Sequence, residues 1–147
     1  MVTRVGLAFF AGRDEWAVVL SPGNYFSPQT CMYEIFIRKN RVWYRRDHNT
    51  MVEDEPGYRG LLHVGDIHVD IAVLHGRMQS IYSGEGRGHP NPTVFPWGTR
   101  PWVIRVLLIL QQEYRIQLPQ CRGTELVDYI ERRIASLSKN IIPLIGA

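Results

Sequence analysis

Two carboxylates and one arginine in this sequence have surroundings in which a side chain could do acid/base chemistry. Glu113 falls, on a helical wheel, among the apolar residues Trp102, Val106 and Ile109. A carboxyl group in an apolar setting has a raised pKa and can work as a general acid or base. Alternatively, the helix ends at this point and Glu113 reaches solvent.

Glu131 is the second candidate carboxylate. It lies at the edge of the apolar stripe of the last predicted helix, one step from Val127 and Ile134. There it either lines a cavity or, as is commoner for such a carboxylate, pairs with a neighbouring arginine. Arg105 is the only cation in the predicted helix 102–114, and we expect it to pair with one of the two glutamates.

Arg38 is the candidate that would polarise an oxygen atom of a substrate. Period-two alternation places it on the same strand face as Glu34 and Phe36. It could orient a carbonyl or carboxylate ligand, or it could pair with Glu34 on an exposed sheet. The catalytic residues that we predict are therefore Arg38, Glu113 and Glu131.

Aromatic side chains are numerous enough to enclose an apolar substrate. A shaped cavity that holds the reacting atoms in place needs only one or two groups to move a proton. The residues that we predict to bind the substrate are Trp16, Phe36, Trp43, Thr99, Trp102, Tyr114 and Tyr129.

The sequence gives little support for a metal ion or a nucleotide cofactor. Asp66, His68 and Asp70 would point the same way along a strand, but they lack a further partner of known spacing, and such alternation also describes a wet strand face. The glycine-rich segment 84–88 lacks the Lys-Ser/Thr of a phosphate loop and runs into Pro90. We therefore predict no metal site and no cofactor.

Arginines dominate the positive charge of the chain, since only Lys39 and Lys139 of its 17 cationic residues are lysines. Segment 38–46 combines them with Trp43 and Tyr44, and such a strip could hold single-stranded nucleic acid. The alternative is a solvated hairpin with an arginine-rich outer face. We favour the solvated hairpin, because the net charge is only +3 and the chain has no second basic tract that could bind nucleic acid together with segment 38–46.

The elements that must position these residues are strands first and helices afterwards. The predicted strands, which form a β-meander with a hairpin around residues 39–41, are residues 5–10, 16–20, 32–38, 42–46 and 61–69. Alternation places Tyr33, Ile35 and Ile37 on one face of the third strand. The polar segment 47–59 predicts a mobile loop.

The second half of the sequence predicts about three helices. Asp70 and Thr124 are suitable N-caps, and segment 102–114 is apolar at nearly every angle, so that we expect a central helix covered on most sides. Segment 83–96 predicts a loop beside the functional face. The core stripes of the first and last helices are Ile71, Leu74, Met78 and Ile81, and Val127, Ile130, Ile134 and Leu137.

Length and composition describe one soluble domain. The chain has 147 residues, of which 45% are hydrophobic and 21% charged. It has no apolar run of membrane-spanning length and no signal-peptide pattern, so we expect a cytoplasmic protein that does not contact a membrane. Cys31 and Cys121 are too few for a disulfide framework. The apolar segment 141–145 either forms a homodimer interface or folds back onto its own domain.

Two short segments carry a resemblance to a known group of folds. They read EWAVV at residues 15–19 and TRPWV at residues 99–103. In that group a strand reads His-Trp followed by apolar residues, and a later helix reads roughly Cys-x-x-Trp-Val. From residue 4 to 138 the chain thus resembles small fungal proteins with a circularly permuted papain-like fold, akin to the NlpC/P60 and lecithin:retinol acyltransferase group.

The resemblance implies the fold without the chemistry of that group. A thiol hydrolase needs a thiolate and a histidine that activates it. Here Glu15 stands in the place of the histidine, and Thr99 stands in the place of the cysteine. What remains is a pocket at a helix N-terminus, which favours an anionic or polarised ligand group.

These observations predict an α+β protein in which an antiparallel β-meander packs against about three helices, with a permuted papain-like arrangement. The function that we expect is a cofactor-independent isomerase or cyclase that rearranges a small specialised metabolite, for example by a semipinacol shift. The alternative is a non-catalytic papain-like relic that binds a protein partner or a ligand. An enzyme predicts single polar residues whose loss abolishes turnover, whereas a binding module predicts a contiguous exposed apolar patch.

Overall fold

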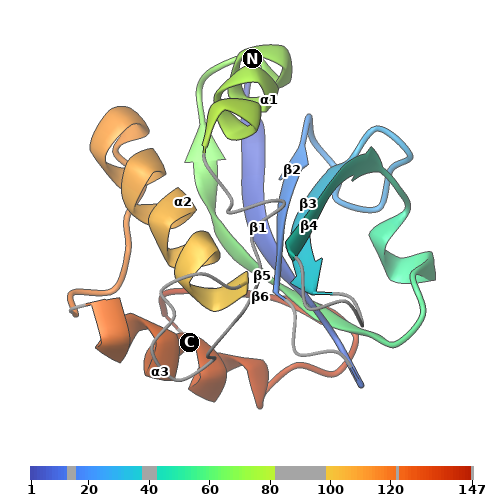
Figure 1. Cartoon of the computed structure of the whole chain (residues 1–147), viewed down its shortest axis with the longest axis vertical. Coiled ribbons are helices and arrows are strands. Elements are labelled where there is room, and N and C mark those ends of the chain that lie inside the picture. Colours follow the sequence, from blue (N-terminus) through green and yellow to red (C-terminus); the bar gives the residue numbers. More distant parts are fainter. Residues whose placement is uncertain (13–15, 38–42, 82–98, 122, 147) are drawn as a thin grey trace.

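The protein has an α+β fold, in which a six-stranded, mostly antiparallel sheet packs against three helices (Figure 1). The structure, a computed structural model, describes residues 1–12, 16–37, 43–81, 99–121 and 123–146. The predicted catalytic residue Arg38 and the predicted loop 83–96 lie outside these ranges.

The sheet begins as the predicted meander and then departs from it. Its strands are β1 (Thr3–Phe10), β2 (Ala17–Ser21), β3 (Cys31–Ile37), β4 (Trp43–Asn49), β5 (Tyr58–Ile67) and β6 (Asn140–Pro143), in the spatial order β4-β3-β2-β1-β5-β6. Neighbouring strands from β1 to β4 are antiparallel. β5 pairs with the edge of β1 that faces away from β2, and β6 lies parallel to β5.

The prediction of a loop over residues 47–59 is correct only for its middle, residues 50–57. Residues 47–49 complete β4, Val52–Asp54 form a short 3-10 helix (η1), and residues 58–59 begin β5. The error has a physical cause. β4 is an edge strand with polar side chains, and η1 contributes only one buried residue, Val52, so neither shows an apolar period.

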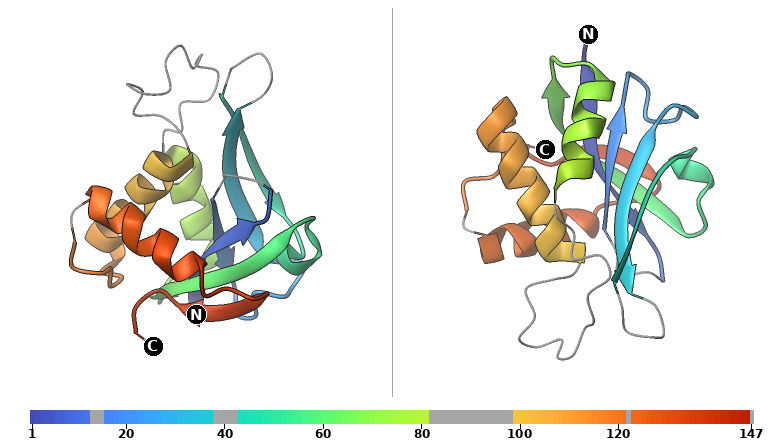
Figure 2. Two further views of the ribbon diagram at one scale, coloured as in Figure 1. Left: turned by 90° about the horizontal axis from the view of Figure 1, so that it is seen from below. Right: turned by 45° about the horizontal axis from the view of Figure 1, so that its top comes forward.

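The three helices are α1 (Ile71–Ser80), α2 (Thr99–Tyr114) and α3 (Gly123–Ile134), and all lie on one side of the sheet (Figure 2). The predicted N-cap of α1 is confirmed, because the Asp70 carboxylate accepts a hydrogen bond of 2.8 Å from the N–H of Ala72. α3 begins at Gly123, so Thr124 lies in its first turn and not at its N-cap. None of these described helices combines the length and the hydropathy needed to cross a membrane.

α2 is less enclosed than its composition predicts. Trp102, Val106, Leu107 and Leu110 are buried on the sheet, but 46% of Leu108 is exposed. Val103 and Ile104 are buried as well, so the expectation of a helix covered on most sides holds for the first half of α2 and fails at Leu108 and at residues 111–113, which are exposed.

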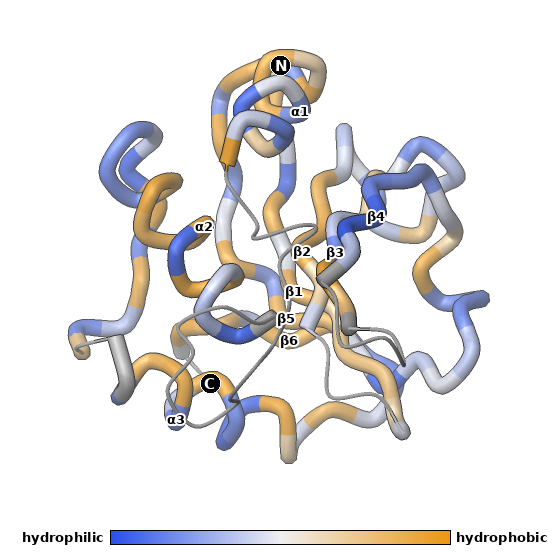
Figure 3. The backbone as a smooth tube through the Cα atoms, in the orientation of Figure 1, coloured by the Kyte–Doolittle hydropathy of each residue, from blue (hydrophilic) through white to orange (hydrophobic). Residues whose placement is uncertain are grey.

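The strands β1, β2, β3 and β5 contribute to two cores, one on each face of the sheet. In β1, Val5, Leu7 and Phe9 face the helices, whereas Ala8 and Phe10 face the other side. The loop between β2 and β3 and the helix η1 cover this second face. Hydrophobic residues accordingly mark β1, β2 and α2, whereas β4 is hydrophilic (Figure 3).

The apolar C-terminal segment folds back onto its own domain, which is one of the two alternatives given for it. Ile141 and Ile142 of β6 stand opposite Leu61 and Leu62 of β5. Leu144 is fully buried, and its N–H donates to the carbonyl oxygen of His63 at 2.8 Å. This segment thus packs within its own chain. A homodimer stays a prediction, and this segment gives it no support.

Candidate functional site

Glu113 is an exposed partner of an arginine and not a buried acid. Its two carboxylate oxygens accept hydrogen bonds of 2.8 and 2.6 Å from the Nε and Nη2 atoms of Arg77 in α1. These hydrogen bonds lower the pKa of Glu113, whereas we expected an apolar setting to raise it. The alternative reading is correct, since α2 ends at Tyr114 and Glu113 reaches solvent.

Glu131 is also paired on the surface. Its Oε1 atom lies 3.2 Å from Nη2 of Arg100, and nearly half of each side chain is exposed. Glu113 and Glu131 thus pair with Arg77 and Arg100. These two ion pairs join α2 to α1 and to α3.

Most of the predicted substrate-binding aromatics are spread through the core. Trp16 and Trp102 are buried on the helix side of the sheet, and Tyr114 packs against the same core. The hydroxyl of Tyr129 donates a hydrogen bond of 2.8 Å to the carbonyl oxygen of Leu144. These four rings serve packing and the attachment of the C-terminal segment.

The other predicted binding residues lie on β3, β4 and α2. Phe36 is half-buried and stacks on Tyr44, with ring centroids 6.0 Å apart and an interplanar angle of 23°. Trp43 is the first residue of β4 and Thr99 the first of α2, but their side chains are outside the described part of the structure.

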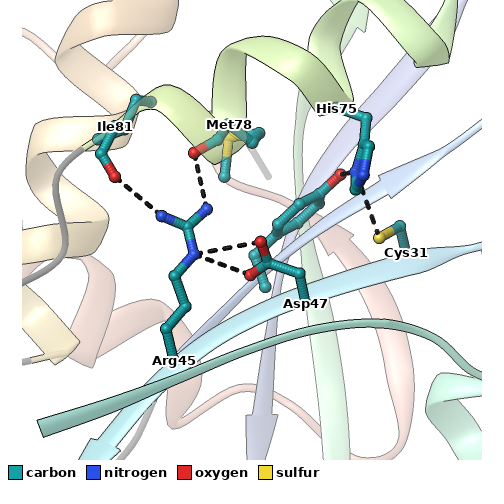
Figure 4. Close-up of polar contacts among 7 residues, drawn as sticks. Cys31, Arg45, Asp47, His75, Met78 and Ile81 are labelled. Carbon is teal, nitrogen blue, oxygen red and sulfur yellow. Dashed lines mark hydrogen bonds and ion pairs between the residues drawn. The ribbon is translucent and has the colours of Figure 1, made fainter. Parts of the chain in front are cut away.

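A different set of polar side chains meets between α1 and the sheet. The hydroxyl oxygen of Tyr33 in β3 lies 2.6 Å from Nδ1 of His75 in α1, and the Cys31 sulfur lies 4.0 Å from the same nitrogen (Figure 4). Tyr33 and Cys31 share a strand face, because they are two residues apart. His75 reaches them from α1, where it stands one helical turn after Ile71.

An open pocket of about 200 Å³ adjoins this cluster. It is bounded by the N-terminal turn of α1, the start of β3 and the end of β4. Its lining residues are Gln29, Cys31, Tyr33, Asn49, Ile71, Ala72 and His75. Tyr33 and Cys31 are buried beneath the pocket and His75 is partly exposed, so the imidazole is the group of this cluster that a small ligand would meet.

Burial decides the protonation of the two groups that face His75. It raises the pKa of the Cys31 thiol and strongly raises the pKa of the Tyr33 hydroxyl. Both groups therefore keep their protons at neutral pH. A buried neutral thiol is a poor nucleophile, so the Cys31–His75 contact does not restore the thiolate chemistry of the papain-like group.

Arg45 fastens the helix that carries His75 to the sheet. Its Nη1 and Nη2 atoms donate to the carbonyl oxygens of Ile81 and Met78 at 2.8 and 2.7 Å, at the C-terminal end of α1. Its Nε atom donates to Asp47 at 2.9 Å (Figure 4). A cation at a helix C-terminus satisfies the last carbonyls and the helix dipole.

Sequence reasoning missed Tyr33, His75 and Cys31 as a site. Tyr33 was read as a core residue, and no motif surrounds His75. The signal that could have found them is a lone histidine on the apolar stripe of α1, between Ile71 and Met78, that faces a strand with an inward tyrosine. That signal is weak, because the sequence does not say which strand α1 covers.

A second tyrosine–histidine pair lies on the opposite face of the sheet. The hydroxyl oxygen of the fully buried Tyr25 is 2.6 Å from Nδ1 of His63. The Nε2 atom of His63 lies 3.4 Å from Asp66, which also pairs with Arg4 at 3.6 Å. Burial is the main cause that lowers the pKa of His63.

These contacts account for two of the three residues that we weighed as metal ligands, Asp66 and Asp70. Asp66 pairs with Arg4 and His63, and Asp70 caps α1. Within the described residues, no three His, Cys, Asp or Glu side chains are grouped as the ligands of a metal ion would be.

Comparison of the chain with models of protein families, with curated proteins and with solved structures gave no match. The class of protein that the fold and the site define is an α+β domain with a tyrosine–histidine–cysteine cluster beside an open pocket.

Proposed function

We propose that this protein is a cytoplasmic, cofactor-independent isomerase or cyclase that rearranges a small specialised metabolite by acid/base catalysis at His75. One observation carries the proposal. The imidazole of His75 lines a pocket and is held at Nδ1 by the Tyr33 hydroxyl at 2.6 Å. A catalytic base needs such an orienting partner on its second nitrogen.

A hydroxyl partner suits a histidine that must both take and give a proton. A hydroxyl can donate to Nδ1 or accept from it, so Tyr33 satisfies either tautomer of His75. The Nε2 atom can then hold a proton or accept one, and it is the nitrogen that we assign to the substrate. Tyr33 stays protonated throughout, since its pKa is strongly raised.

The only group chemistry that the protein must supply for such an isomerisation is this transfer of a proton. In a semipinacol-type shift of an α-hydroxy imine, the hydroxyl proton goes to Nε2 of His75 as the C–O bond becomes a carbonyl. One carbon substituent migrates to the imine carbon, and the proton is returned to the imine nitrogen. The product has the same mass as the substrate, and the reaction needs neither an oxidant nor a reductant.

The resemblance to permuted papain-like proteins remains part of the proposal. The guanidinium of Arg100 lies 5.3 Å above the ring of Trp16, so the two motif segments are neighbours in space. This proximity supports the resemblance. In such a relic the acid/base site at His75 would use residues other than Glu15 and Thr99, which stand in the places of the histidine and the cysteine.

Mass spectrometry of metabolite extracts, from the native host with and without this protein, tests the proposal. We expect one product to be replaced by an isomer of equal mass when the protein is absent. An unchanged profile would contradict the enzyme and favour the alternative, a non-catalytic module that binds a partner or ligand. A host that carries only His75→Gln should give the profile of the host without the protein.

A further inference from the structure

A second pocket lies on the other side of Ile71. It has a volume of about 160 Å³ and is lined by Met1, Val2, Thr3, Pro22, Asp70 and Ile71. Ile71 thus lines both this pocket and the pocket beside His75. Its side chain is the ridge between them.

The strand register places the two pockets along one end of the sheet. Arg4 stands opposite Ser21, and Cys31 stands opposite both Leu20 and Asn49. The second pocket therefore lies at the ends of β1 and β2, and the pocket beside His75 lies at the ends of β3 and β4. Figure 1 shows α1 at this end of the sheet, beside the N-terminus of the chain.

The length of the combined groove follows from the strand spacing. It runs across four neighbouring strands, from β1 to β4. At about 4.8 Å between strands, three spacings give about 14 Å. A ligand of two or three rings has this length, whereas a single ring would fill only one of the pockets.

The groove has a polar end and an apolar end. The hydroxyl of Tyr33, the imidazole of His75 and the amides of Gln29 and Asn49 belong to the first pocket. The second pocket presents mainly the side chains of residues such as Val2 and Pro22.

Its lining also holds little charge. Among the described residues that line the two pockets, none is a lysine or an arginine. The carboxylate of Asp70 is already engaged with the N–H of Ala72. Met1, whose terminal amino group is a cation, lines only the second pocket, so an anionic group at the His75 end would lose its hydration without gaining a lysine or arginine partner.

We propose that the two pockets are one binding groove for an uncharged, elongated ligand. The ligand presents a carbonyl or hydroxyl oxygen to His75, and its apolar part crosses Ile71 to the pocket beside Pro22. This substrate class rests on the proposed function, because it assigns the reacting oxygen to the His75 end. Ile71 then decides how long a substrate the site accepts.

The groove can be tested with three defined probes, whose binding is followed through the backbone amide NMR signals of the whole chain. Benzamide is short and neutral, benzoate has the same shape with a negative charge, and 4-phenylbenzamide is long and neutral. We expect benzamide to shift the signals of Asn49 and His75. 4-Phenylbenzamide should shift those of Thr3 and Asp70 as well and bind at least about tenfold more tightly, since a second ring is buried. Benzoate should bind at least about tenfold more weakly than benzamide.

Two matched substitutions on α1 separate the groove from the helix itself. Ile71→Trp should fill the ridge and remove the advantage of 4-phenylbenzamide over benzamide, although benzamide also binds more weakly because Ile71 lines its pocket. Val73→Trp is the control, because 55% of Val73 is exposed and it lines neither pocket. It should leave both affinities unchanged.

Several outcomes would overturn the groove. It fails if 4-phenylbenzamide shifts only the signals at the His75 end, if benzoate binds as tightly as benzamide, or if Ile71→Trp and Val73→Trp behave alike. The proposed function is judged separately by the products of His75→Gln. If the probes bind as expected while that variant still makes the product, the groove stands and the acid/base role of His75 falls.

Discussion

The hydroxyl oxygen of Tyr33 lies 2.6 Å from Nδ1 of His75, beside an open pocket. The same distance separates Tyr25 from His63 on the other face of the sheet. Both tyrosines are fully buried and both histidines are partly buried, but His75 lines a pocket, whereas His63 lines neither of the two pockets formed by described residues. We therefore expect the His75 pair to serve function and the His63 pair to serve stability.

Tyr25→Phe should destabilise the protein. It removes the hydroxyl that satisfies Nδ1 of His63 in a half-buried setting, and the loss of such a hydrogen bond costs about 1–2 kcal/mol. Urea denaturation measures the change in the free energy of unfolding. Product formation by this variant should persist below its unfolding midpoint. A Tyr25→Phe variant as stable as the parent would contradict the structural role of the pair.

His63 should make stability depend on pH. Burial, followed by the nearby Arg4, lowers the pKa of His63 in the folded protein below its ordinary value of 6.5. Between the two values the unfolded chain binds more protons than the folded one, so stability falls as the pH drops below about 6.5 and is fully present above it. Urea denaturation across this range, compared with His63→Gln, isolates the effect. A difference between the two proteins that does not change with pH would refute it.

Glu113→Gln and Glu131→Gln should both keep the activity. Each glutamate forms an ion pair on the surface, and neither lines the pocket beside His75. Exposed ion pairs contribute little to stability, so the thermal midpoint should also change little. The metabolite profile of a host that carries either variant checks this. Loss of the product in one of them would return the proton transfer to that carboxylate.

Gly6→Ala should destabilise the protein, and Gly76→Ala should not. A Cβ atom on Gly6 would lie 2.7 Å from Cδ2 of Leu61 and 3.0 Å from the hydroxyl of Tyr25, in the packed second core. Overpacking of this kind costs about 1–3 kcal/mol. Gly76 lies in the exposed middle of α1 with nothing within 4 Å, so alanine there should add up to about 1 kcal/mol through helix propensity. Urea denaturation of both variants measures the contrast, which would be absent if Gly6 had room for a methyl group.

The sequence predicted the elements that have a strong local pattern. The alternation in β3 correctly placed Tyr33 and Ile35 on one face, and the carboxylate of Asp70 correctly marked the start of α1. Both signals are local, because a strand alternates with period two and an N-cap side chain bonds the next turn. The end of β4 had no such signal, since its polar residues lie at the edge of the sheet.

The candidate site depends on contacts that no local pattern encodes. His75 and Tyr33 are 42 positions apart and meet only because α1 crosses the end of β3. Glu113 shows the converse error. Glu113 does lie on the same helical face as Trp102 and Val106. The helix ends one residue later, however, so the carboxylate reaches Arg77 and solvent.

The rate of product formation by purified His75→Gln, on the substrate found by the metabolite comparison, tests the central claim most directly. Parent protein and Glu113→Gln are the references, and circular dichroism shows that all three are folded. We expect His75→Gln to be at least about a hundredfold slower than both, because a positioned acid/base group contributes a factor of this size. A rate within a few-fold of the parent protein would contradict the assignment of His75 as the group that moves the proton.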